Sequence, residues 1–340
     1  MNKRIWVVMG LVVLLAFSVG ILGSGDEKSL TTIGISQLVE HPALNAVREG
    51  IKDILEENGY EEEEDVEFIF RNAQNDMSNA KSIAQTFKSQ NVDIVITIAT
   101  NTSVAAKQVL DETPILVTAV TNFEIAGLVD SMEAYENPGD NENITGYSDQ
   151  IPVKSQFELI REMVPNVEKV GNIYNAGEPN SSFLTELAED ACDEMGIELI
   201  KATVSNTSEV SQAAQSLRGR VDAIWISTDN TVVSGLGPVA QVAKKEKIPV
   251  VVADPTSVGK GALVGYGFDY YDHGRLAGQK LIQLLEGEKP NEIPIGIGAP
   301  EDQKLVLDLD QAEEMGFEFP SSVVEKANAI RYLGEMWKKQ

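Results

Sequence analysis

The chain has 340 residues, a formal net charge of −26 at pH 7 and a hydrophobic content of 43%. This length suits two domains of ordinary size better than one small domain. The negative charge would repel a phosphate backbone, and no cluster of Lys and Arg interrupts it beyond the N-terminus, which argues against nucleic acid as a partner. A single cysteine, Cys192, cannot form an intrachain disulfide, so the redox compartment stays undetermined.

The first residues have the pattern of an export signal. Lys3 and Arg4 precede an uncharged apolar stretch over residues 5–22, and small residues and then charged residues follow it. As a helix this stretch would span about 27 Å, close to the ~30 Å hydrocarbon core of a bilayer. We therefore predict that residues 1–25 are either a cleaved signal peptide or an uncleaved membrane anchor. No other stretch has this length and apolar character, so the rest of the chain is expected outside the membrane.

Beyond Ser29, short β-branched runs alternate with amphipathic stretches, which is the pattern of βαβ units and a largely parallel sheet. Leu44, Val47 and Ile51 show the helical spacing of apolar residues in the first of these stretches. The first half of the chain predicts strands over residues 32–36, 66–71, 94–98 and 115–119, and helices over residues 41–59 and 76–91.

The second half repeats this order. It predicts strands over residues 170–174, 198–202, 223–226 and 250–252, and helices near residues 182–195, 209–217 and 232–245. The phrase "VDIVITIATNTS" over residues 92–103 is answered by "VDAIWISTDNTV" over residues 221–232. Two copies are too few for an array of short repeats, so we predict a duplicated α/β fold of two doubly wound parallel-sheet domains.

Polar clusters follow the strands in both halves. In an open parallel sheet, ligands bind beyond the carboxyl ends of the strands, so two facing sheets would bring these clusters to one cleft. The same residue types also cap helices and form turns, which leaves a purely local role open for each of them. The candidate ligand-binding residues are Ser36, Gln37, Thr100, Asn101, Thr102, Thr118 and Ala119 in the first half, and Asn175, Glu178, Asn180, Asp229, Asn230, Asp254 and Asp269 in the second.

Several longer motifs carry a resemblance to a known family. They include "IGISQLVEHPAL" over residues 33–44, "NAQNDMSNAKSIAQTF" over residues 72–87, "STDNTVVS" over residues 227–234 and "GYGFDYYDHGRLAG" over residues 265–278. With these motifs the chain resembles the solute-binding proteins of ABC importers with the periplasmic-binding-protein-like I fold, in the tryptophan and tyrosine (TrpX-like) subfamily. The resemblance covers essentially everything after Ser29.

The resemblance implies two lobes joined by a three-crossing hinge. The N-terminal lobe would hold residues 30–147 plus 270–288 and the C-terminal lobe residues 150–267 plus 291–337. The crossings would lie near residues 147–152, 268–270 and 287–294.

The resemblance also implies a role. The chain would be an extracytoplasmic binding subunit without catalysis, which delivers its ligand to an ABC permease driven by a cytoplasmic ATPase. It would be periplasmic, secreted or anchored on the outer face of the membrane. Many members carry a lipid-attachment cysteine after the apolar segment, but here Ser24 stands at that place.

The residue types suit an amino-acid ligand, whose carboxylate and ammonium are both costly to bury without partners. The start of the helix after the third strand and the hydroxyls of Thr100, Thr102 and Thr118 suit the carboxylate. Asp229 and Asp254 suit the ammonium, so each lobe would hold one end. The resemblance makes the ligand aromatic. The candidate stacking residues at strand ends and crossings are Tyr147, Tyr174, Phe268 and Tyr270.

Other kinds of site find little support in the sequence. The two histidines, His41 and His273, show no ligand spacing with acids or with Cys192, so no metal is expected. No G-x-S-x-G, Walker A or strand-linked G-x-G-x-x-G motif occurs, so neither an enzyme of these classes nor a cofactor is expected. A LacI-like repressor would need a basic helix-turn-helix where this chain has its export segment. Two alternatives stay open: the extracellular sensing domain of a signalling system, and an ABC binding protein for a sugar or nucleoside.

Overall fold

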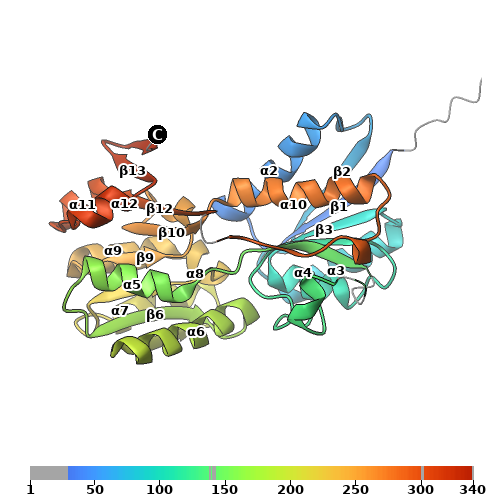
Figure 1. Ribbon diagram of the computed structural model, residues 1–340. Coiled ribbons are helices and arrows are strands. Elements are labelled where there is room, and N and C mark those ends of the chain that lie inside the picture. The colour runs from blue at the N-terminus through green and yellow to red at the C-terminus, as the bar shows by residue number, and fades with distance from the viewer. Residues whose placement is uncertain (1–29, 138, 140–142, 300–301, 339–340) are drawn as a thin grey trace, which may run out of the picture.

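The computed structural model describes residues 30–137, 139, 143–299 and 302–338. The export segment predicted over residues 1–25 lies outside the described residues. Among the described helices, none has the length and apolar character needed to span a bilayer. The chain forms two α/β lobes that lie side by side, each built on one sheet (Figure 1).

The first lobe contains a six-stranded sheet in the order β11-β5-β4-β3-β1-β2, and all neighbouring strands are parallel. Its strands are β1 (Thr31–Gln37), β2 (Val66–Asn72), β3 (Ile94–Ile98), β4 (Ile115–Val120), β5 (Ile144–Ser148) and β11 (Gly296–Ile297). Its helices are α2 (Pro42–Glu57), α3 (Met77–Gln90), α4 (Thr100–Lys107) and α10 (Tyr270–Leu285), with short turns η1 (Met132–Tyr135) and η5 (Pro290–Glu292). β3 and β4 are buried along their whole length, because helices cover both faces of the sheet.

Helix α10 follows the second lobe in the chain but packs against α2 of the first. A Cβ atom on Gly50 would lie 2.2 Å from the carbonyl oxygen of Tyr271, and one on Gly274 would lie 2.2 Å from that of Val47. Only glycine lets the two helix backbones approach this closely, so any larger residue would force them apart. This contact attaches α10 to the first lobe.

The second lobe contains an eight-stranded sheet in the order β14-β13-β12-β10-β9-β8-β6-β7. Its strands are β6 (Lys169–Asn175), β7 (Glu198–Val204), β8 (Ala223–Ile226), β9 (Val250–Val252), β10 (Val264–Phe268), β12 (Gln303–Asp308), β13 (Ala329–Tyr332) and β14 (Glu335–Lys338). Its helices are α5 (Val153–Met163), α6 (Pro179–Met195), α7 (Val210–Ser216), α8 (Asn230–Ser234), α9 (Leu236–Glu246), α11 (Leu309–Met315) and α12 (Ser321–Lys326), with short turns η3 (Thr207–Glu209) and η4 (Pro255–Ser257).

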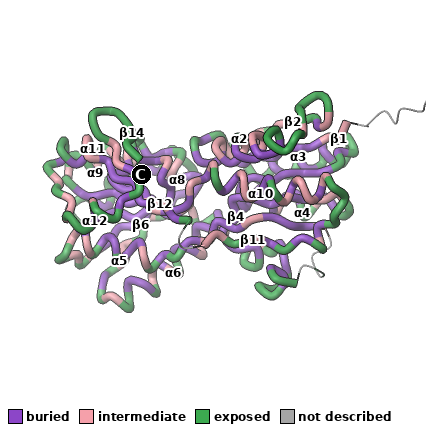
Figure 2. The backbone as a smooth tube through the Cα atoms, turned by 45° about the horizontal axis from the view of Figure 1, so that its top comes forward, coloured by how far each residue is buried: buried purple, intermediate pink, exposed green. Residues whose placement is uncertain are grey.

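The strand orders confirm the predicted duplication. The order β7-β6-β8-β9-β10 of the second lobe repeats β2-β1-β3-β4-β5 of the first, and all these neighbours are parallel. The second lobe then adds β12, antiparallel to β10, and the β13–β14 hairpin. Figure 2 shows the central strands of both lobes buried, and the edge strand β14 and much of the outer loop surface exposed.

One predicted helix is divided in two. The helix expected over residues 232–245 is α8 followed by α9, with a break at Gly235. A Cβ atom at Gly235 would lie 2.9 Å from Cγ2 of Thr207, so this position faces the turn before α7 at close range. Helix α8 also begins earlier than expected, because the side chain of Asp229 caps it.

Three crossings connect the lobes. They lie at residues 149–152 between β5 and α5, at Asp269 between β10 and α10, and between the end of β11 and the start of β12. The expectation of a third crossing near residues 287–294, with residues 291–337 in the second lobe, is wrong for residues 293–297. Ile293 and Ile295 are buried in the first lobe, and β11 pairs with β5. A strand of two residues gives no periodic pattern that could have predicted it.

Candidate functional site

The carboxyl ends of the parallel strands in both lobes border one cleft. A cavity of about 20 Å³ lies in it, which is about the room that one water molecule needs. The first lobe lines it with His41, Ala43, Leu44, Ala119 and Tyr270, the first crossing with Asp149, and the second lobe with Asn180, Thr228, Asp229, Asn230, Val233 and Asp254.

Side chains of the two lobes contact each other around this cavity. Nδ2 of Asn75 donates a hydrogen bond of 2.9 Å to Oγ1 of Thr231. Nε2 of His41 lies 3.3 Å from Oδ1 of Asn230. The hydroxyls of Thr121 and Thr228 lie 3.5 Å apart, at the limit of a hydrogen bond. These contacts hold the lobes close together and account for the small cavity.

Five buried polar atoms at the cleft have no hydrogen-bond partner within the described part of the chain. They are Oγ of Ser36, Nδ1 of His41, Oγ1 of Thr118, Oδ1 of Asp149 and Oδ1 of Asn180. A buried polar group without a partner costs about 1–3 kcal/mol. Their concentration at strand ends and at the first crossing marks this cleft as a place for a polar ligand.

The acids of the second lobe, by contrast, accept hydrogen bonds from the protein itself. Asp229 is fully buried and accepts from the backbone N–H groups of Asn175 (2.6 Å) and Val232 (2.8 Å) and from Oγ of Ser181 (2.5 Å). Burial, and then the nearby charge of Glu178, raise the pKa of Asp229 to about 7. Asp229 therefore lines the cavity with oxygens that are already engaged.

Glu178 is also buried, but it does not line the cavity. Its carboxylate accepts from the backbone N–H and the side chain of both Asn230 and Thr231, at 2.7 to 3.1 Å. Asn175 serves the same region, because its Nδ2 donates to Oγ1 of Thr231 (2.9 Å). Glu178 and Asn175, both predicted as ligand-binding residues, thus support α8.

Two further acids cap the starts of helical segments, Asp254 a short turn and Asp269 the long helix α10. Asp254 lines the cavity but accepts from the backbone and hydroxyl of Thr256 and from Oγ of Ser257, at 2.8 to 2.9 Å. Asp269 caps α10 and lines a separate hollow of about 60 Å³ at the hinge, together with Tyr147 and Phe268. The ligand-binding role of Asp269 therefore stays a prediction.

The predicted residues of the first lobe fall into three groups. Ala119 lines the cavity, in a left-handed conformation with φ of 53°. Ser36 and Thr118 are buried near the ends of β1 and β4, and their hydroxyls have no partner within the described residues. The others are not in the lining: the amide of Gln37 bonds within the lobe, Oγ1 of Thr102 donates to the carbonyls of Ile98 and Ala99, and Thr100 and Asn101 begin α4.

Three polar cavity residues are absent from the candidate ligand-binding residues predicted above: His41, Asp149 and Thr228. His41 was considered only as a metal ligand, and Tyr270 only as a stacking residue. Asp149 directly follows β5, so the strand-end argument applied to it as well. Burial lowers the pKa of His41 and raises that of Asp149. Among the described residues, no three His, Cys, Asp or Glu side chains come together as a metal site.

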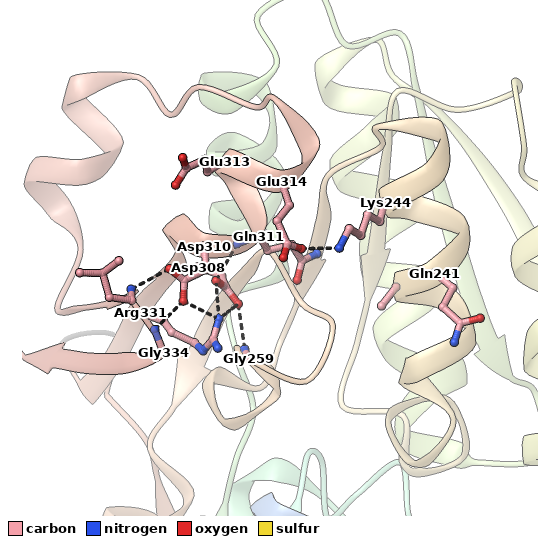
Figure 3. A pocket seen from close by; sticks show the side chains of 12 residues that line it. Gln241, Lys244, Gly259, Asp308, Asp310, Gln311, Glu313, Glu314, Arg331 and Gly334 are labelled. Carbon is pink, nitrogen blue, oxygen red and sulfur yellow. Dashed lines mark hydrogen bonds and ion pairs between the residues drawn. The ribbon is translucent and has the colours of Figure 1, made fainter.

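A larger hollow of about 700 Å³ lies on the second lobe alone (Figure 3). Its acids are engaged in structural contacts, since Nη1 of Arg331 lies 3.0 Å from both Oδ1 of Asp308 and Oδ2 of Asp310. Asp308 ends β12, which is antiparallel to β10, so this hollow lies at the edge of the sheet away from the cleft. We therefore do not take this hollow as the ligand site, although it is larger than the cavity in the cleft.

Comparison with known proteins places this architecture in a family. The model of the family "ABC transporter substrate binding protein" matches residues 32–331. A tyrosine-binding protein from Clostridioides difficile strain R20291 is 38% identical over 270 residues, which are 79% of this chain and 77% of that protein.

Two solved structures extend the comparison. An ABC domain from Streptococcus pneumonia in complex with L-Trp has 30% identity and a TM-score of 0.83, covering 89% of this chain and 100% of its own. The ligand-free, open structure of CD0873, a substrate-binding protein with adhesive properties from Clostridium difficile, has 34% identity and a TM-score of 0.66, covering 88% and 98%. The chain belongs to the ABC transporter substrate-binding proteins, a non-catalytic family.

Proposed function

We propose that this protein binds a free aromatic amino acid, tryptophan or tyrosine, between its lobes and delivers it to an ABC permease driven by a cytoplasmic ATPase. The observation that carries the proposal is the set of unpartnered buried polar atoms at the cleft, in a family that binds solutes. The names of the relatives support the ligand class, since one is a tyrosine-binding protein and another was solved with L-Trp.

Asp149 is the proposed partner of the ligand ammonium. Its Oδ2 accepts from the hydroxyl of Tyr270 (2.8 Å), while its Oδ1 has no partner within the described residues and the side chain lines the cavity. Burial raises the pKa of Asp149 and so disfavours its charged form. A ligand ammonium beside it would offset this, because a positive charge favours the charged carboxylate. Asp229 and Asp254 would add negative potential, but their oxygens are engaged elsewhere.

The ligand carboxylate is assigned to the first lobe. Thr118 lies near the end of β4, beside β3, and α4 begins directly after β3. The Thr118 hydroxyl and the first N–H groups of α4 form a suitable setting for an anion. Ser36, the last but one residue of β1, pairs with Thr97 while Thr118 pairs with Ile98, so the two hydroxyls lie on opposite faces of the sheet and do not share one carboxylate. His41, Leu44, Val233 and Tyr270 would then surround the aromatic side chain, with apolar contacts and one unpartnered ring nitrogen.

Binding on this proposal requires the lobes to open and close. A cavity of about 20 Å³ does not admit an amino acid, so the ligand would enter when the lobes separate at the three crossings. The lobe arrangement supports this view, because it is closer to the L-Trp complex (TM-score 0.83) than to the open, ligand-free relative (0.66), although both have similar identity to this chain.

We assign the protein to the extracytoplasmic side of the membrane, where the family typically acts. Residues 1–25 would serve as signal peptide or anchor. The direct test of the ligand is calorimetry on the chain without residues 1–25, with each amino acid and with representative sugars and nucleosides. We expect a dissociation constant in the micromolar range or below for tryptophan or tyrosine. Heat from a sugar or nucleoside only, or from no compound at all, would reject the proposal.

A further inference from the structure

Glu178 occupies an unusual position for a buried carboxylate. It is 1% exposed, and all four hydrogen bonds of its carboxylate reach the first two residues of α8. These two residues, Asn230 and Thr231, are the ones whose side chains contact the first lobe through His41 and Asn75. Glu178 thus lies directly behind the inter-lobe contacts.

A carboxylate only accepts hydrogen bonds, and this fixes the direction of the bonds in front of it. Thr231 donates its hydroxyl proton to Oε1 of Glu178 (2.7 Å), so its oxygen is left as an acceptor. Asn230 donates from Nδ2 to Oε2 (2.7 Å), so its Oδ1 must point the other way. The second lobe therefore presents two acceptors to the first.

The first lobe offers donors at the matching places. Nδ2 of Asn75 reaches Oγ1 of Thr231 at 2.9 Å, and the Asn75 backbone is held in place because its N–H donates to the carbonyl of Leu38 (2.7 Å). Nε2 of His41 faces Oδ1 of Asn230 at 3.3 Å, which suits the neutral tautomer with its proton on Nε2.

We propose that Glu178 is a positioning residue that orients Asn230 and Thr231 as acceptors and thereby sets how readily the two lobes close. This role needs no contact with the ligand, and it differs from the ligand-binding role that the sequence suggested. It also holds whatever solute the cleft takes, because the contacts join protein to protein.

The test uses Glu178→Gln, which keeps the size of the side chain but places an NH₂ group where one acceptor stood. That group would face the N–H donors of α8 and force one of the two side chains to reverse. We expect small-angle scattering of the ligand-free chain to show a lower closed population, and the affinity for L-tryptophan or L-tyrosine to fall about 10- to 100-fold. The double variant Glu178→Gln/Asn230→Asp should restore closure, because the carboxylate then lies on the other side of the same hydrogen bond.

The matched control is Asp308→Asn. Asp308 is also buried in the second lobe and caps a helix, α11, but it lies far from the cleft. This variant should lower the unfolding temperature without changing closure. If Glu178→Gln behaves in the same way, the proposal is wrong.

A second experiment keeps the proposal testable if Glu178→Gln does not fold. Asn75→Ala and Thr231→Ala each remove one side of the inter-lobe contact. Thr231→Ala also removes the hydroxyl that donates to Glu178 and accepts from Asn175, so Asn75→Ala is the cleaner of the two. We expect the two changes to be coupled. The closed population of the double variant should then be no smaller than that of the single variant with the larger loss. Independent, additive losses of closure would overturn the role of this contact.

Discussion

The two sides of the cleft are prepared for a ligand in different ways. On the second lobe, the carboxylates of Glu178, Asp229 and Asp254 are all engaged by backbone and hydroxyl donors of their own lobe. On the first lobe, the hydroxyls of Ser36 and Thr118 are as deeply buried but have no partner within the described residues. The charged groups that sequence reasoning favours for the ligand are thus the ones with the least free bonding capacity.

This difference separates shaping the site from binding the ligand. The second lobe uses its acids to fix α8 and the turn after β9, which makes a rigid wall. The first lobe and the first crossing keep free acceptors and hydroxyls, which a ligand can engage without displacing a protein bond. On this view a substitution in the second lobe that leaves Asn230 and Thr231 oriented toward the first lobe costs mainly stability, and one in the first lobe or at Asp149 costs mainly affinity.

The largest effect should come from Asp149→Asn. The change removes the charge proposed to pair with the ligand ammonium while keeping the size of the side chain. We expect a loss of affinity of about 100-fold or more, or about 3 kcal/mol, for L-tryptophan or L-tyrosine in calorimetry. Exposed Asp272→Asn, on α10, is the control and should bind normally. Equal affinities of the two variants would place the ammonium elsewhere.

Much of the fold could be predicted from the sequence. The apolar runs such as 94–98 and 223–226 are strands in the structure, because a strand buried on both faces is a continuous apolar run. The duplicated phrases indicated the repeated strand order. What could not be predicted depends on tertiary packing: β11 has only two residues, and the break at Gly235 arises from its contact with Thr207.

The candidate site could be predicted only in part. The strand-end argument found the region, and Ala119, Asn180, Asp229, Asn230 and Asp254 line the cavity. Sequence alone cannot tell an acid that caps a helix from one that awaits a ligand, because the same residue type at the same strand end serves both. Asp229 and Asp149 differ only in how many donors the folded chain brings to them.

Acidification should affect the first lobe through His273, which lies behind the cleft. Burial lowers its pKa from 6.5 to about 4, and its Nε2 accepts the N–H of Ala119 at 3.2 Å. Between these pH values the folded state binds fewer protons than the unfolded state, so the free energy of unfolding should fall by about 3 kcal/mol as the pH drops from 6.5 to 4. In thermal unfolding, His273→Phe should lose this part of the pH dependence.

Asp229 of the second lobe should respond in the opposite direction. Its pKa is raised to about 7, so the folded state binds more protons than the unfolded state below that pH and is stabilised by acid. Both proteins contain Asp229, so the difference between their pH dependences of stability reports on the histidine alone. An unchanged pH dependence in the variant would mean that His273 is not buried in its neutral form.

Removing the hydroxyls should change affinity less than Asp149→Asn does, but it tests the contrast between the two lobes directly. Thr118→Val and Ser36→Ala remove hydroxyls without partners, so each should leave the unfolding temperature unchanged or slightly higher. Thr118→Val should weaken amino-acid binding about tenfold, since it removes one bond to a charged carboxylate. Ser36→Ala should weaken binding less, because Ser36 lies on the opposite face of the sheet. Ser181→Ala, in the second lobe, leaves Oδ2 of Asp229 with one donor fewer.

The expected outcome for Ser181→Ala is the reverse of that for Thr118→Val. It should cost about 1–3 kcal/mol of stability, because a buried carboxylate loses a donor, and it should change affinity by less than about threefold. Calorimetry and thermal unfolding on the same three proteins give both quantities. If stability and affinity fall together in all three, the two sides of the cleft are not specialised.

The smallest effect on binding should come from a substitution of Cys192, a buried residue of the second lobe. Cys192 lies on the buried face of α6 and is 1% exposed, and burial raises the pKa of its thiol to about 12, so the thiolate is scarce at neutral pH. Cys192→Ala should cost about 1 kcal/mol of stability through lost packing and leave affinity unchanged. In the folded wild type the thiol should resist a disulfide reagent until denaturant is added. Rapid labelling, or an affinity loss as large as that of Thr118→Val, would show that packing far from the cleft controls binding and would remove the distinction between shaping and binding residues.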